Sequence, residues 1–245
     1  MRKNSILIAF MLFVTYLQAQ FKESIEANRP GNALNVFTVG KNIFQIETAI
    51  DYSNSDDSFS SNSFLRYGVT ENIEINGGVI YDLSSSYKIF NIGAKYTIFE
   101  GDDILPSTAI QLSINVPNET FYEHVFSSVL FILNYPLTER LSYTLNFGAS
   151  VDFGKTKIMV EGKEIEKILV TGLYVLNIVY KLTDKWNFFI EPYGRFNGNL
   201  RPSRTLSFNS GFSYLVNKNL QLDVLGGYGI NSKDYNASLG VSWRL

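Results

Sequence analysis

The sequence predicts an all-β chain that folds as a closed antiparallel transmembrane β-barrel of about twelve strands, connected as an up-and-down meander. Three observations predict this fold: an apolar–polar alternation with a period of two, connections that alternate between short and long, and apolar faces that carry no charge. Aromatic residues make up 15% of the 245 residues and charged residues only 18%. This composition excludes a disordered chain, which would be poor in aromatic residues and rich in charge.

The N-terminus is typical of a signal peptide. Two basic residues precede an apolar stretch at 6–17, which is too short to span a bilayer as a helix. Ala19 provides a small residue for cleavage, so we expect residues 1–19 to be removed on export. We expect residues 20–40 to form an N-terminal periplasmic segment or a plug, and residues 41–245 to form the transmembrane barrel.

Each predicted strand is marked by its alternation. In 141–153 large apolar residues alternate with small or polar ones, and a strand places these two sets on opposite faces. Most segments have about ten residues, the length that a tilted membrane strand needs. The twelve predicted strands are 43–52, 63–69, 73–81, 89–99, 108–116, 125–135, 141–153, 168–182, 186–196, 206–216, 220–230 and 235–245. Pro192 lies inside one of them and cannot donate to the ladder, so a bulge or kink is expected there.

The connections between these strands alternate in length. Tight polar turns are expected at 69–72, 137–140, 182–185 and 216–219. Longer polar loops are expected at 53–62, 117–124, 154–167 and 197–204, the third of which has room for a small hairpin of its own. Short turns at one end and long loops at the other are typical of bacterial outer-membrane barrels. An even strand number places both termini on the short-turn, periplasmic side.

Charge falls in only one phase of the alternation. The apolar faces of the predicted strands carry no Asp, Glu, Lys or Arg, as a lipid-facing wall requires. Charged residues of the opposite phase are predicted to line the pore: Glu47, Asp51, Arg66, Glu74, Lys95, Asp152, Lys181, Glu191, Arg195, Asp223 and Arg244. They either form a selectivity lining or pair into salt bridges that fill the lumen. Glu191 and Arg195 share one strand face and are expected near a constriction.

The sequence contains no pattern that predicts an enzyme. There is no cysteine and only one histidine, so no thiolate or histidine metal site and no cofactor are expected. The net charge of −2 gives no basic field for nucleic acid. His124 at the edge of a long loop leaves open a rim hydrolase, but its sequence neighbours alone do not supply the geometry of a nucleophile and its base.

Seven stretches resemble a known family. They are Asn28–Gly31, Lys41–Glu47, Leu65–Thr70, Glu191–Gly194, Gly211–Val216, Asn219–Asp223 and Leu239–Leu245. Together they are similar to the outer-membrane β-barrel transporter family named for the meta-pathway of phenol degradation, and the resemblance covers most of the mature chain. It departs at Asn28, where the family usually has an aspartate, and at Leu245, where it usually ends on phenylalanine. The resemblance implies a transporter of small compounds, aromatic ones included, without catalytic residues.

The expected function is an outer-membrane channel that passes small solutes, hydrophobic or aromatic ones included, by passive diffusion through a narrow polar lumen. The alternatives are a structural or ligand-binding barrel with a closed lumen and, further off, the rim hydrolase. The expected partners are outer-membrane lipid, the barrel-assembly machinery and a small-molecule solute, with no nucleic acid.

Overall fold

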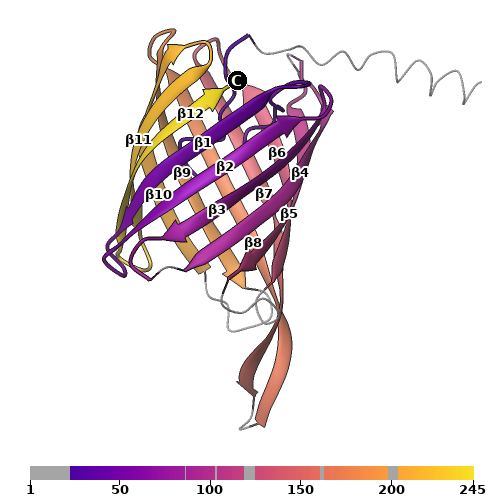
Figure 1. The fold of residues 1–245 in the computed structure, drawn as a ribbon, viewed down its shortest axis with the longest axis vertical. Coiled ribbons are helices and arrows are strands. Elements are labelled where there is room, and N and C mark those ends of the chain that lie inside the picture. Colours follow the sequence, from indigo (N-terminus) through magenta and orange to yellow (C-terminus); the bar gives the residue numbers. More distant parts are fainter. Residues whose placement is uncertain (1–22, 86, 103, 119–124, 161–162, 198–203) are drawn as a thin grey trace, which may run out of the picture.

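The computed structural model describes residues 23–85, 87–102, 104–118, 125–160, 163–197 and 204–245 (Figure 1). Twelve strands form one closed barrel in which each strand pairs antiparallel with the next, and β1 closes the ring against β12. Their bounds are β1 Phe44–Ser53, β2 Ser58–Gly68, β3 Ile73–Asp82, β4 Lys88–Phe99, β5 Ser107–Pro117, β6 Phe126–Pro136, β7 Leu141–Val160, β8 Lys163–Lys181, β9 Trp186–Asn197, β10 Arg204–Asn217, β11 Leu220–Gly229 and β12 Tyr235–Arg244. The predicted barrel class is confirmed. Among the described residues, no helix has the length and apolar character needed to cross a membrane.

Three strands, β2, β7 and β8, extend well beyond their predicted bounds. β2 begins at Ser58, because its polar first residues still pair with β1 through Ser58 and Ser53. β7 and β8 continue past the barrel as a two-stranded ribbon, in which Thr156 pairs with Lys167 and Val160 with Lys163 (Figure 1). The hairpin expected within 154–167 is therefore confirmed.

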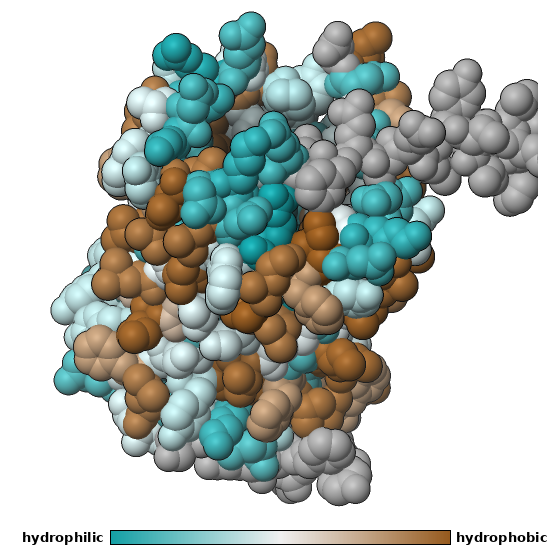
Figure 2. Space-filling view, turned by 45° about the horizontal axis from the view of Figure 1, so that its top comes forward, coloured by the Kyte–Doolittle hydropathy of each residue, from teal (hydrophilic) through white to brown (hydrophobic). Residues whose placement is uncertain are grey.

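The outer face of the barrel is apolar. Leu65, Ile92 and Leu239 are 56%, 65% and 67% exposed in the isolated chain, although each lies in the middle of a strand. Apolar side chains gather over the side of the barrel, and hydrophilic ones gather near its ends (Figure 2). Such a large apolar surface is unfavourable in water, but it is stable in contact with the hydrocarbon core of a bilayer.

Aromatic pairs flank this apolar band at both ends. Near the short turns, the ring centroids of Trp186 and Tyr214 lie 4.6 Å apart. Near the longer loops, the ring of Tyr52 lies 5.0 Å from Phe59 and 6.2 Å from Tyr235. Aromatic rings at both ends of strands are typical of the two interfacial girdles of a membrane barrel.

The prediction of a bulge at Pro192 is wrong. The register of β9 is unchanged across this residue: Pro192 pairs with Phe208 of β10, and the β8 partners keep the same spacing on either side. On the β8 side the ladder omits Leu176 and Asn177, as expected where a proline supplies no N–H. The barrel therefore accommodates the proline by losing ladder pairs rather than by shifting register.

The two faces of β7 provide a test of the membrane wall. Leu145 faces outward at mid-strand, opposite Leu133 of β6, while the neighbouring Thr144 lines a cavity in the lumen. Leu145→Arg is expected to destabilise the folded protein in lipid by about 2–4 kcal/mol, which is the cost of a cation at the bilayer midplane. Thr144→Arg is the control and should cost much less. Urea titration of vesicle-inserted protein measures both, and equal losses would contradict the assigned faces.

Candidate functional site: the lumen and its N-terminal segment

Residues 23–43, called the N-terminal segment from here on, run inside the barrel. The segment enters beside a short turn, where the Ile25 amide donates to the Lys218 carbonyl at 2.8 Å. It leaves at the same end, where the Asn42 amide donates to the Gly68 carbonyl at 2.8 Å. Between these points it turns inside the lumen, and Val36 is fully buried. The sequence left open a periplasmic tail or a plug, and the described part of the segment lies within the barrel.

Arg66 of β2 joins the wall to the N-terminal segment. Its Nε and Nη2 donate to the two carboxylate oxygens of Glu74, each at 2.9 Å, and its Nη1 donates to Glu47 at 2.8 Å. The same guanidinium donates to the backbone carbonyls of Glu26 at 2.6 Å and Phe37 at 3.1 Å. One side chain, itself fully buried, thus holds two wall carboxylates and both arms of the segment.

Lys95 of β4 completes this buried charge cluster. Its Nζ lies 3.7 Å from Glu74 and donates to the Asn35 carbonyl at 3.0 Å. Arg66 and Lys95 therefore balance Glu47 and Glu74, so the cluster carries no net charge. Burying four charges is tolerated because each one is both paired and hydrogen-bonded.

Glu191 of β9 binds the deepest turn of the segment without a cation. Its carboxylate accepts backbone N–H bonds from Asn32 at 2.8 Å and Ala33 at 3.0 Å, and amide bonds from Asn177 and Asn209 at 3.0 and 3.1 Å. Among the described residues no lysine or arginine pairs with this fully buried group. Successive backbone N–H groups that converge on an anion form a nest, and here the anion belongs to the barrel wall.

Gly31 makes this contact possible. Its φ is +98°, and a Cβ atom built on it would lie 2.4 Å from a Glu191 carboxylate oxygen. Any larger residue would be strained and would push the carboxylate away from the turn.

Gly31→Ala is therefore expected to unseat the segment from Glu191. The buried Ala33, replaced by cysteine as a reporter, should then react with a maleimide at least about tenfold faster, since a strained contact of this kind costs about 1–3 kcal/mol. Gly226→Ala is the control, because a Cβ atom there meets no atom closer than 3.9 Å. Equal labelling rates in the two variants would show that Gly31 does not position the segment.

Arg29 makes the third contact between the segment and the wall. Its Nη2 donates to Asp223 of β11 at 2.9 Å and to Ser238 of β12 at 2.7 Å, and the Gln221 side chain donates to its carbonyl at 2.9 Å. The guanidinium passes over Gly240, where a Cβ atom would lie 2.4 Å from its Nε. A residue without a side chain is required there for the ion pair to form.

Apolar contact between segment and wall is small by comparison. Val36 packs with Ala109 of β5 and Ile132 of β6, and Leu34 and Phe37 pack against this cluster. The segment is therefore held mainly by hydrogen bonds to its backbone and by the ion pair between Arg29 and Asp223.

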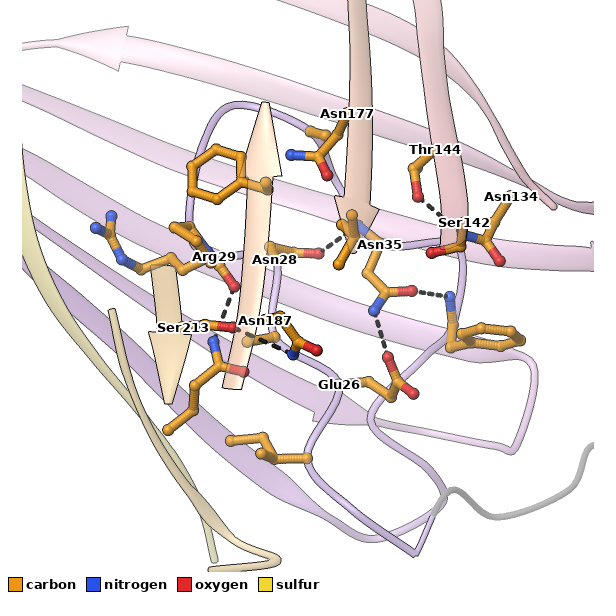
Figure 3. Close-up of a pocket in the computed structure, with 18 of the residues that line it drawn as sticks. Glu26, Asn28, Arg29, Asn35, Asn134, Ser142, Thr144, Asn177, Asn187 and Ser213 are labelled. Atoms are coloured by element: carbon orange, nitrogen blue, oxygen red, sulfur yellow. Dashed lines mark hydrogen bonds between the residues drawn. The ribbon is translucent and has the colours of Figure 1, made fainter. Parts of the chain in front are cut away.

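Two cavities remain in the lumen on opposite sides of the segment. One, of about 470 Å³, lies toward the short turns and is lined by Asn134, Ser142 and Asn187 among others (Figure 3). The other, of about 280 Å³, lies toward the longer loops. Asn28, Arg29 and Leu34 line both, so this part of the segment is the partition between them.

The predicted pore-lining residues fall into two groups. Seven are buried against the segment or its neighbours: Glu47, Arg66, Glu74, Lys95, Glu191, Asp223 and Arg244. The other four lie nearer the ends of the strands, where Asp51 and Asp152 are half-buried and Lys181 and Arg195 are exposed. Glu191 and Arg195 therefore lie in different surroundings, one buried and one exposed, and the constriction expected near this pair stays a prediction. His124 lies outside the described residues, and the described ones contain no cluster able to hold a metal ion.

A family model described as "Putative MetA-pathway of phenol degradation" matches residues 27–245. The chain belongs to this family. Its fold is similar to the NanC porin (TM-score 0.65, 9% identity, covering 82% of this chain and 100% of that one). It is also similar to the KdgM porin solved with disordered oligogalacturonate (0.62, 14%, 81% and 98%) and to an outer membrane channel from Pseudomonas putida F1 (0.55, 10%, 90% and 100%). These likenesses show a shared outer-membrane barrel fold. No curated protein matches the sequence.

The stretches that resemble the phenol-degradation family meet around the N-terminal segment. Arg29 and Gly31 from the first stretch contact Asp223 and Glu191 from two later ones, and Gly240 near the C-terminus makes room for Arg29. Sequence reasoning placed these residues on strands and turns but did not connect them. The available signal was an Arg-Pro-Gly turn before the barrel together with an inward carboxylate, Glu191, whose partner the alternation does not identify. At Asn28, the side-chain oxygen accepts from the Asn35 amide at 2.9 Å, a bond that an aspartate oxygen also makes.

Proposed function

We propose that this protein is an outer-membrane channel for small solutes and that its N-terminal segment gates the lumen. Both termini lie on the periplasmic side in this proposal, the signal peptide directs export, and the barrel-assembly machinery inserts the strands. The protein has no catalytic role in it.

One observation carries the gating proposal. Asn28, Arg29 and Leu34 line the cavity on either side of the segment, so the same few residues separate the two halves of the lumen. Displacing this turn joins the cavity of about 470 Å³ to that of about 280 Å³. A continuous polar path then runs between the two ends of the barrel.

The path of the segment supports its displacement. Both of its ends lie at the short-turn end, at Ile25 and Asn42, so the turn between them withdraws toward that end without threading through the barrel. Its contacts are mainly polar, and water replaces such contacts more readily than it replaces an apolar core. Gly40 and Asn42, with φ of 93° and 61°, lie at the point where the segment joins β1.

The wall chemistry supports weak ion selectivity and a small solute. The wall charges Glu47, Glu74, Arg66 and Lys95 neutralise one another, so no single sign of charge dominates the lumen. The larger cavity also includes Val179, Phe189 and Leu215, which provide apolar surface for the hydrophobic or aromatic solutes that the family name suggests.

A second candidate, a structural barrel with a permanently closed lumen, is favoured by one observation. The buried charges near the segment are fully hydrogen-bonded: Arg66 makes five donor bonds, three to the wall carboxylates Glu47 and Glu74 and two to backbone carbonyls of the segment. A network of this density also stabilises a lumen that never opens.

Planar-bilayer recording of the purified full-length protein separates the two candidates. We expect brief, low-conductance openings, and we expect proteoliposomes to swell in small sugars, amino acids or aromatic acids. A protein that shows the heat-dependent gel shift of a folded barrel, yet neither conducts nor swells vesicles, would overturn the channel and leave the closed barrel.

A further inference from the structure

We propose that the cavity of about 280 Å³ is a binding site for an uncharged, single-ring polyol such as a monosaccharide. The inference rests on the proposed channel function in one respect: the polyol is taken to be a solute of that channel. The cavity is lined by the inner faces of β1 to β5 and by the innermost turn of the N-terminal segment.

One side of the cavity is apolar. Phe64 points inward from β2, and Gly78 of β3 leaves the space that its ring occupies, since a Cβ atom at Gly78 would lie 2.6 Å from the ring. Ile80 and Leu34 also line the cavity. An aromatic ring beside aliphatic side chains provides a flat apolar surface on which the C–H face of a ring can pack.

The other side presents amides whose hydrogen-bonding capacity is unused. The side chain of Asn62 has no hydrogen-bond partner among the described residues, and it lines the cavity. Asn91 donates to Asn115 at 2.8 Å, which leaves the buried Oδ1 of Asn91 without a partner. An amide both donates and accepts, as a hydroxyl group does, so these groups match a ligand that carries several hydroxyls.

The charges at the cavity are already neutralised. Arg29 is paired with Asp223 at 2.9 Å, and Glu47 is paired with Arg66 at 2.8 Å. An ionised ligand would have to compete with these pairs, so the site favours a neutral one. A ring with a single hydroxyl fits less well, because it leaves most of the amides unpaired.

The size of the cavity matches a ligand with one ring. Its volume of about 280 Å³ lies just below the usual range of ligand pockets, roughly 300–1,000 Å³. We expect one ring to fill this space and a disaccharide to extend beyond it.

Equilibrium binding to full-length protein tests the site without requiring conduction. The protein is held in a detergent without a sugar headgroup and is titrated separately with methyl α-D-glucoside, myo-inositol, glucuronate and phenol. Saturation-transfer NMR measures the binding of each compound. Asn62→Leu removes an amide that makes no other bond, while Asn187→Leu makes the same change in the larger cavity. We expect both neutral polyols to bind, roughly tenfold weaker binding in Asn62→Leu, and unchanged binding in Asn187→Leu.

Three results would overturn the inference: no polyol binding, polyol binding that Asn62→Leu leaves unchanged, or binding of phenol or glucuronate in preference to the neutral polyols. Conductance is recorded separately on the same samples. A conducting protein that binds no polyol overturns this inference alone, and a silent barrel that binds polyol overturns only the channel function.

Discussion

Deleting residues 24–39 is expected to convert brief, small openings into a steady conductance at least several times larger. Barrels of about eight strands are filled by side chains, whereas barrels of 16–18 strands leave an aqueous channel. A twelve-stranded barrel lies between these cases, so whatever occupies its lumen decides whether it conducts. Inward positions such as Gly93, Ser113 and Ser150 are small and leave room once the segment is gone.

Planar-bilayer recording measures this effect, and the gel shift confirms that the barrel has folded. The matched control deletes residues 155–166, a range that removes the pairs of β7 and β8 beyond the barrel, such as Lys157 with Glu166 and Val160 with Lys163. That deletion should leave the conductance at the wild-type level. Equal conductance in the wild type and in the variant lacking residues 24–39 would show that the segment does not obstruct the path.

Replacing Arg66 by methionine is expected to destabilise the barrel by about 3–5 kcal/mol, the usual cost of breaking a buried ion pair by removing one partner. The guanidinium is fully buried, pairs with Glu47 and Glu74, and binds the carbonyls of Glu26 and Phe37. Without it, Lys95 alone faces two buried carboxylates.

Urea unfolding from lipid vesicles measures the loss. Arg195→Met is the control, since Arg195 is exposed and its side chain enters no ion pair among the described residues. That variant is expected to change stability by no more than about 0.5 kcal/mol. A similar loss in both variants would mean that the buried cluster does not contribute as its geometry indicates.

The strands could be predicted because lipid on one face and a polar lumen on the other impose a period of two. The signal weakens where both faces are polar, which is why β2 was expected to begin at Ser63 rather than Ser58. It also weakens where a strand leaves the membrane, as β7 does beyond Phe153. The missing N–H of Pro192 does not shift the register as the sequence predicts, because the neighbouring ladder bonds hold it.

The direction of the charged side chains was predictable, but their partners were not. Alternation assigns Glu191 to the lumen and says nothing about what fills the lumen beside it. The residues that bind Glu191, Asn32 and Ala33, lie in a segment without periodicity, and they act through backbone N–H groups that no side-chain pattern reveals. Positive φ at Gly31 is likewise visible only in the folded chain.

A reversible cross-link between the segment and the wall tests the gating account most directly. Ala33 N and Asn177 Nδ2 donate to the same Glu191 oxygen, each at 3.0 Å, and the chain has no native cysteine. Cysteines at these two positions, joined by a short cleavable thiol reagent, tie the turn to β8 while single channels are recorded. We expect openings with free thiols, none after cross-linking, and their return after reduction. Openings that persist unchanged in the cross-linked protein would contradict gating by the segment.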